Sequence, residues 1–65
     1  MSKYPDIEVK LIGQDGNAFA ILGAVMKALR RAGLDEKVAQ EYYTEATSGD
    51  YDNLLAVTDN WVEIY

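Results

Sequence analysis

The sequence predicts an α+β domain with the element order β-α-α-α-β, in which three helices pack on a two-stranded sheet. Two observations favour this fold class. Near both ends of the chain, apolar residues alternate with charged ones, which is the two-residue period of a half-buried strand. Between these ends, apolar residues recur at the three- and four-residue spacing of helices in three segments, and turn residues separate the segments.

The first strand is expected at residues 7–11, where the side chains have a period of two. Apolar and charged residues alternate there: Ile7, Glu8, Val9, Lys10 and Leu11. Residues 1–6 are expected to form a flexible N-terminal lead in which Pro5 favours extended backbone before it. Residues 7–65 then form the single compact α/β domain that a chain of 65 residues supports.

A first helix is predicted over residues 18–32, with Asn17 as its N-cap and Gly33 at the position after its end. Its central stripe and the residues that widen it are Phe19, Leu22, Met26 and Leu29, with Ile21, Val25, Ala28 and Ala32. Gly23 suggests a close approach of another element. A hairpin over residues 17–22 is the competing interpretation, but the helical pattern continues for about four turns, longer than a typical strand.

Two more helices and a second strand complete the chain. Asp35 is the expected N-cap of a helix over residues 36–47, and Asp50 that of a helix reaching about Asn60. Val62 to Tyr65 alternate again and predict a short strand, with Glu63 outward and across from Lys10. If the elements alternate up and down, the two strands run parallel. A lone two-stranded sheet is marginal in water, so pairing of sheet edges across a two-fold axis is expected.

Composition excludes several classes of function. The chain has no Cys and no His, which removes disulfides, thiol nucleophiles and the commonest general base. Its net charge of -5 argues against a nucleic-acid partner. Lys27, Arg30 and Arg31 form a basic cluster that suits the end of a helix. No signal peptide or membrane-spanning run is recognised, so a soluble, cytoplasmic protein without a membrane partner is expected.

Candidate ligand sites are weak. Gly13, Gly16 and Asn17 lie in a loop before a helix, where free N–H groups can hold an anion, but no phosphate-binding motif is present and an ordinary turn competes with this interpretation. Asp50 begins a segment like a calcium loop, yet Leu55 and Trp61 occupy the positions that require Gly and Glu. We therefore expect no metal, no cofactor and no catalytic residue.

The aromatic residues are the strongest candidates for an interface. The candidate interface residues are Tyr42, Tyr43, Tyr51, Trp61 and Tyr65. Adjacent positions on a helix cannot both face one side, so one of Tyr42 and Tyr43 is expected to be partly exposed. A core position competes with an interface role for Trp61.

Three segments together resemble a family of small, uncharacterised bacterial and phage-associated proteins: GQDGNAFAILG, ALRRAG and EATSGDYDNLL, within residues 13–55. The resemblance covers roughly residues 7–64 and implies a bacterial, cytoplasmic protein. It carries no activity and no functional residue.

The sequence thus predicts a non-catalytic protein–protein interaction or regulatory module that binds itself as a homodimer, or binds another protein. The expected mechanism combines pairing of strand edges with an exposed Tyr/Trp surface. The alternative is a small-ligand or anion-binding domain that uses the loop from Gly13 to Asn17.

Overall fold

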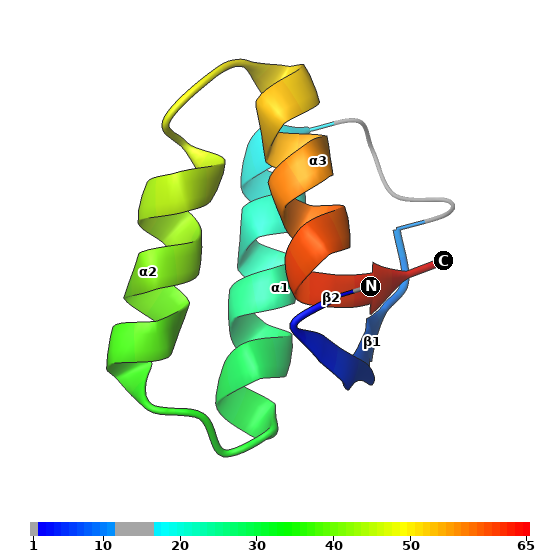
Figure 1. Ribbon diagram of the computed structural model, residues 1–65, viewed down its shortest axis with the longest axis vertical. Helices are drawn as coiled ribbons and strands as arrows, with labels where there is room; N and C mark the ends of the chain where they lie inside the picture. Colours follow the sequence, from blue (N-terminus) through cyan, green and yellow to red (C-terminus); the bar gives the residue numbers. More distant parts are fainter. Residues whose placement is uncertain (1, 12–16) are drawn as a thin grey trace.

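The chain has the element order β1-α1-α2-α3-β2 in a computed structural model that describes residues 2–11 and 17–65 (Figure 1). The elements are β1 Tyr4–Val9, α1 Ala18–Arg31, α2 Glu36–Ala46, α3 Tyr51–Trp61 and β2 Val62–Ile64. The two strands pair in parallel, which confirms the predicted α+β fold and strand orientation. Helices α1 and α3 lie between α2 and the sheet, so one face of the sheet packs on these two helices.

Strand β1 begins at Tyr4, earlier than the alternation from Ile7 predicts. Two contacts to the C-terminal part of the chain explain this. The Lys3 N–H donates to the Asn60 carbonyl oxygen at 2.8 Å, and the Tyr4 ring lies 5.8 Å from the Trp61 ring, centroid to centroid. Part of the segment expected to be an N-terminal lead therefore belongs to the strand.

The register of the sheet differs from the predicted one. Tyr4 pairs with Val62 and Glu8 with Glu63, so β1 carries an irregular stretch between these two pairs. The predicted pairing of Glu63 with Lys10 is wrong, because Lys10 lies beside Tyr65 instead. The Tyr65 N–H donates to the Val9 oxygen at 3.1 Å and the Leu11 N–H to the Tyr65 main-chain oxygen at 2.6 Å. Two carboxylates consequently face each other across the strands.

All three predicted N-caps are confirmed. The side chain of Asn17 accepts from the Phe19 N–H at 2.8 Å, that of Asp35 from the Lys37 N–H at 3.2 Å, and that of Asp50 from the Asn53 N–H at 2.9 Å. These bonds satisfy donors that the first helical turn leaves unpaired. The sequence located the helix starts correctly because each of these caps is a local interaction.

The end of α1 is a glycine-dependent turn. Gly33 has a φ of +86°, its N–H donates to the Arg30 oxygen at 3.0 Å, and the Leu34 N–H donates to the Leu29 oxygen at 3.3 Å. This is the hydrogen-bond pattern of a Schellman motif, as Gly33 predicts. Gly23 has a different role from the expected one: a Cβ built there meets nothing within 4 Å, so no element approaches it closely.

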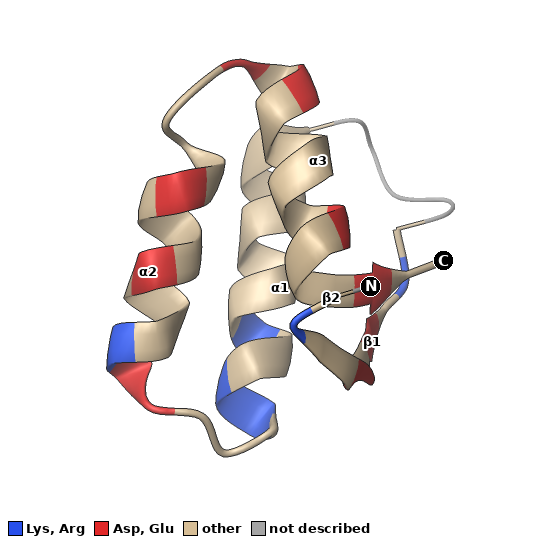
Figure 2. Ribbon diagram, viewed as in Figure 1, with Lys and Arg blue, Asp and Glu red and all other residues tan. Residues whose placement is uncertain are grey.

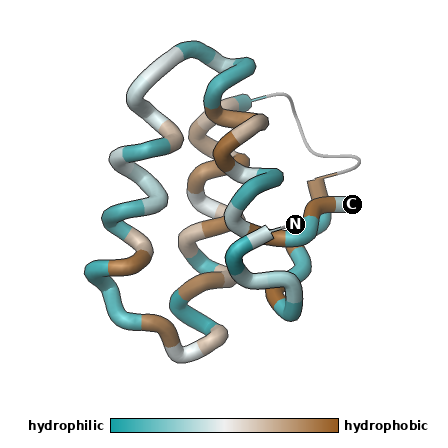
Figure 3. The backbone as a smooth tube through the Cα atoms, viewed as in Figure 1, coloured by the Kyte–Doolittle hydropathy of each residue, from teal (hydrophilic) through white to brown (hydrophobic). Residues whose placement is uncertain are grey.

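The core lies between the three helices and under the inner face of the sheet, which packs on α1 and α3. Figure 3 shows hydrophobic residues concentrated on α1 and α3, whereas α2 is largely hydrophilic. The buried apolar residues are Val9, Ile21, Leu22, Val25, Leu29, Ala39, Tyr42, Ala46, Leu54, Val57, Trp61 and Val62. The buried stripe of α1 therefore consists of Ile21, Leu22, Val25 and Leu29. Phe19, which was expected in the central stripe, is 78% exposed.

Candidate interaction surface

Two of the five aromatic residues predicted for an interface lie in the core. Tyr42 is 0% and Trp61 2% exposed. Their rings meet edge to face at 5.7 Å between centroids, and the Lys3 ammonium lies 4.2 Å from the centroid of the Trp61 ring. Burial raises the pKa of the Tyr42 hydroxyl, and the hydrogen bond to Thr58 partly opposes that effect. Tyr42 and Trp61 are therefore too deeply buried to contact a partner.

The other three predicted aromatic residues reach the surface. Tyr43 is 39%, Tyr51 41% and Tyr65 54% exposed. The buried Tyr42 beside the exposed Tyr43 confirms that the pair divides between core and surface. Phe19 is the most exposed large hydrophobic residue of the described chain, and the sequence reasoning missed it. The available signal was that Ile21 and Val25 define a second stripe, which places Phe19 at its margin.

Three of the exposed aromatic residues, Phe19, Tyr51 and Tyr65, border two apolar hollows that are lined in part by α3. One hollow, of about 240 Å³, is lined by Phe19, Leu22, Tyr51 and Leu54 among others. The other, of about 400 Å³, is lined by Leu11, Leu55, Ile64 and Tyr65. Tyr51 lines the first hollow, and Leu55, one turn further along α3, lines the second. We call Phe19, Tyr51, Leu55 and Tyr65 the aromatic face.

The outer edge of β1 is a second candidate surface. In the parallel ladder, Val9 and Leu11 direct main-chain groups toward Tyr65. Successive residues of a strand direct these groups to opposite edges, so the N–H and C=O groups of Glu8 and Lys10 point away from β2. Within residues 2–11 and 17–65, these main-chain groups of Glu8 and Lys10 have no hydrogen-bond partner, and we call them the free edge of β1. Both side chains are exposed. A hollow of about 220 Å³ lies beside this edge, with Ala24, Ala28 and two cations of α1 on its far side.

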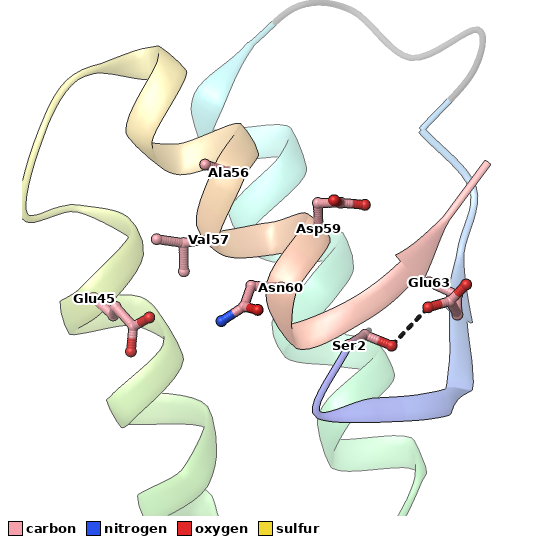
Figure 4. A pocket seen from close by; sticks show the side chains of 7 residues that line it. All are labelled: Ser2, Glu45, Ala56, Val57, Asp59, Asn60 and Glu63. Carbon is pink, nitrogen blue, oxygen red and sulfur yellow. Dashed lines mark hydrogen bonds between the residues drawn. The ribbon is translucent and has the colours of Figure 1, made fainter.

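Another hollow is polar and holds about 670 Å³. Figure 4 shows Glu45 and Glu63 on opposite sides of it, with Asp59 and Asn60 of α3 between them. The Ser2 hydroxyl donates to the Glu63 carboxylate at 2.6 Å. The three carboxylates come from different elements and do not converge on one point. Among the described residues, no three acidic side chains gather closely enough to hold a metal ion.

Most of the basic residues gather where α1 ends and α2 begins, whereas Lys3 and Lys10 flank β1 (Figure 2). Arg30 is engaged there: its Nε and Nη2 donate to the two carboxylate oxygens of Glu36 at 2.8 and 2.9 Å. Hydrogen bonds from Arg30 and then from Gln40 lower the pKa of Glu36 to about 2. Lys27 and Arg31 instead line the hollow beside the free edge of β1.

The predicted anion loop falls largely outside the described residues. Gly13 and Gly16 lie in the undescribed part of the chain, whereas Asn17 is described. The Asn17 side chain caps α1, and its carbonyl oxygen accepts from the N–H groups of Ala20 and Ile21 at 3.0 and 3.2 Å. Both acceptors of Asn17 are therefore committed to starting the helix.

No helix within residues 2–11 and 17–65 is long and apolar enough to cross a membrane. Comparisons with protein-family models, curated proteins and solved structures give no match for the chain. The resemblance noted in the sequence stays a prediction.

Proposed function

We propose that this chain is a small, non-catalytic protein-interaction module that forms a homodimer and acts in the cytoplasm. The observation that carries the proposal is the free edge of β1. A sheet of two strands is marginal in water, and an unpaired edge is a template for another strand. Domains of this size commonly gain stability by oligomerising.

The aromatic face supports a second contact of the same module. Phe19, Tyr51 and Tyr65 are exposed beside two apolar hollows, and aromatic side chains are the commonest anchors at interfaces. This face combines residues of α1, α3 and the C-terminal end, and none of them lines the hollow beside the free edge of β1. A dimer that pairs through β1 therefore leaves it open to apolar side chains of another protein.

The chemistry of the chain supports a non-catalytic role. Neither a His nor a Cys is present to act as base or nucleophile. The lowered pKa of Glu36 has a structural cause in its ion pair with Arg30. The raised pKa of Tyr42 follows from its position in the core, remote from any substrate.

Sedimentation velocity over a range from low to high micromolar concentration tests the proposal. We expect the mass to rise with concentration from 7.2 kDa to about twice that value. A matched variant, Phe19→Ser, tests whether dimerisation depends on the free edge of β1 and not on the aromatic face. It changes the aromatic face alone, so its dimerisation should equal that of the wild type. A wild-type chain that stays monomeric at high micromolar concentration would contradict the proposal.

A further inference from the structure

We propose that β1 pairs antiparallel with β1 of a second copy, centred on Val9, so that Glu8 of each copy lies opposite Lys10 of the other. The result is a four-stranded sheet of order β2-β1-β1-β2 around a two-fold axis. This inference rests on the proposed function, namely that the chain self-associates, and adds which edge pairs and in which register.

In β1, the residues that this arrangement needs for hydrogen bonds direct their main-chain groups outward. Both Glu8 and Lys10 direct their N–H and C=O groups away from β2, whereas Val9 directs its groups toward β2. In an antiparallel pair centred on Val9, each Glu8 exchanges two hydrogen bonds with Lys10 of the second copy. The two Val9 residues then form the non-hydrogen-bonded pair on the axis. Every main-chain group of the free edge receives a partner.

Charge selects this register over its neighbours. Only registers that place Glu8 or Lys10 in hydrogen-bonded pairs are possible, because the main-chain groups of these two residues point toward the incoming strand. Centring the pair on Glu8 puts two carboxylates directly opposite each other, and centring it on Lys10 does the same with two ammonium groups. Like charges directly opposite each other destabilise a strand pair. Centring on Val9 produces two oppositely charged pairs and no like-charged pair.

Charge also disfavours pairing through β2, at the other edge of the sheet. Strand β2 has three residues, Val62–Ile64, and an antiparallel pair centred on its middle residue brings Glu63 against Glu63 of the second copy. The N–H of Val62 is already used, because it donates to the Thr58 oxygen at the end of α3. The outer edge of β1 thus offers both more free groups and better charge complementarity.

There is also room beside the edge of β1. The hollow of about 220 Å³ separates Glu8, Val9 and Lys10 from α1. The residues of α1 that face it include Ala24 and Ala28, whose side chains are small. The long side chains of Lys27 and Arg31 can lay their aliphatic parts along an incoming strand while their charges stay in water.

Charge exchange is the test. The variants are Glu8→Lys, Lys10→Glu and the double variant, compared with the wild type by sedimentation velocity. Each single variant places like charges in both cross-strand pairs, so we expect its dimer dissociation constant to rise at least about tenfold. The double variant restores opposite charges and should dimerise like the wild type. An equimolar mixture of the two single variants should form a heterodimer, because all its cross-strand pairs are opposite in charge.

Loss of folding does not imitate this result. Glu8→Lys replaces the carboxylate opposite Glu63 within the monomer by an ammonium group, so this variant should fold at least as well as the wild type. Circular dichroism of each variant checks this point.

A cysteine at the axis provides an independent measurement. Residues opposite each other in a non-hydrogen-bonded antiparallel pair lie within the Cα distance that a disulfide spans. The chain has no native Cys, so Val9→Cys should give a covalent dimer under mild oxidation. Glu41→Cys, on the exposed side of α2, is the matched control and should stay largely monomeric.

The outcomes separate the two proposals. If the wild type dimerises but both single charge variants dimerise equally well, the register is overturned and the proposed function stands. If the wild type is monomeric throughout, the proposed function fails and the register fails with it. Weakened single variants, a restored double variant and a heterodimer from the mixture support both.

Discussion

The hydroxyl of Tyr42 on α2 lies 2.7 Å from the hydroxyl oxygen of Thr58 on α3, and both residues are fully buried. The direction of this hydrogen bond follows from a second one. The Thr58 hydroxyl donates to the Leu54 carbonyl oxygen at 2.8 Å, which uses its single proton. Tyr42 is therefore the donor and Thr58 the acceptor. This polar link joins two helices through the apolar core.

Removing the Thr58 hydroxyl should cost more unfolding free energy than removing the Tyr42 hydroxyl. Thr58→Val leaves the Tyr42 hydroxyl buried without a partner, which should cost about 1–3 kcal/mol of unfolding free energy. Tyr42→Phe leaves the Thr58 proton on Leu54 and should cost about 0.5–1.5 kcal/mol. Urea denaturation measures both, with Thr44→Val on the exposed side of α2 as a control near zero. A larger loss for Tyr42→Phe than for Thr58→Val would contradict the assigned donor.

Gly23 and Gly33 should respond oppositely to alanine. A Cβ meets no atom within 4 Å at either position, so only backbone effects remain. Gly23 lies inside α1, where alanine should stabilise the fold by roughly 0.5–1 kcal/mol. Gly33 has a φ of +86°, where alanine should cost about 1–2 kcal/mol. Thermal unfolding of the two variants checks the signs, and equal signs would contradict this account of the turn.

Acid should weaken the junction between α1 and α2 in a defined range. The folded-state pKa of Glu36 is about 2, below its ordinary value of 4.5. Its contribution to stability is therefore fully present above about pH 4.5, and it is lost as the pH falls from there through about 2. Both partners are about half exposed, so solvent screens the effect.

Titration of the Glu36 carboxyl carbon by NMR checks this expectation. Arg30→Gln removes the main cause of the shift, so the pKa of Glu36 should move toward its ordinary value in that variant. Lys27→Gln removes a cation from the same helix without touching Glu36 and is the matched control. A wild-type titration midpoint near 4.5 would contradict the ion pair in solution.

Most of the fold followed from local signals. Asn17, Asp35 and Asp50 each cap the helix that follows them, and a cap involves only residues two or three positions apart. The alternation around Val9 likewise identified the first strand from neighbouring residues. The caps were predictable because no distant contact decides them, whereas the start of β1 at Tyr4 depends on contacts with Asn60 and Trp61.

Distant contacts decided what the sequence did not reveal. The register of the sheet depends on Tyr4 packing against Trp61, far along the chain. In α1, the predicted stripe and the buried stripe both contain Leu22 and Leu29. Only the packed structure therefore shows that Phe19 is exposed and does not belong to the core. For the candidate surface, residue type alone suggested five aromatic residues, of which Tyr51 and Tyr65 are exposed and Tyr42 and Trp61 are buried. The free edge at Glu8 and Lys10 could not be predicted from the sequence, because the hydrogen bonds between β1 and β2 decide which main-chain groups point outward.

The unexpected pairing of Glu8 with Glu63 leads to the last prediction. Two carboxylates directly opposite each other destabilise a strand pair, whereas an opposite-charge pair contributes about 0.2–1 kcal/mol. Glu63→Lys should therefore raise the unfolding free energy by up to about 1 kcal/mol, reduced slightly by loss of the exposed hydrogen bond from Ser2. The measurement is urea denaturation at a concentration where the chain is monomeric.

The matched control is Glu41→Lys, which changes the net charge of the chain by the same amount on the exposed side of α2. It accounts for the general relief of repulsion in a chain of net charge -5. Glu63→Lys should stabilise the fold beyond this control, and the surplus should disappear when Glu8→Gln is also present, because the effect belongs to that one pair. If the surplus persists without the Glu8 carboxylate, the two side chains do not interact across the strands.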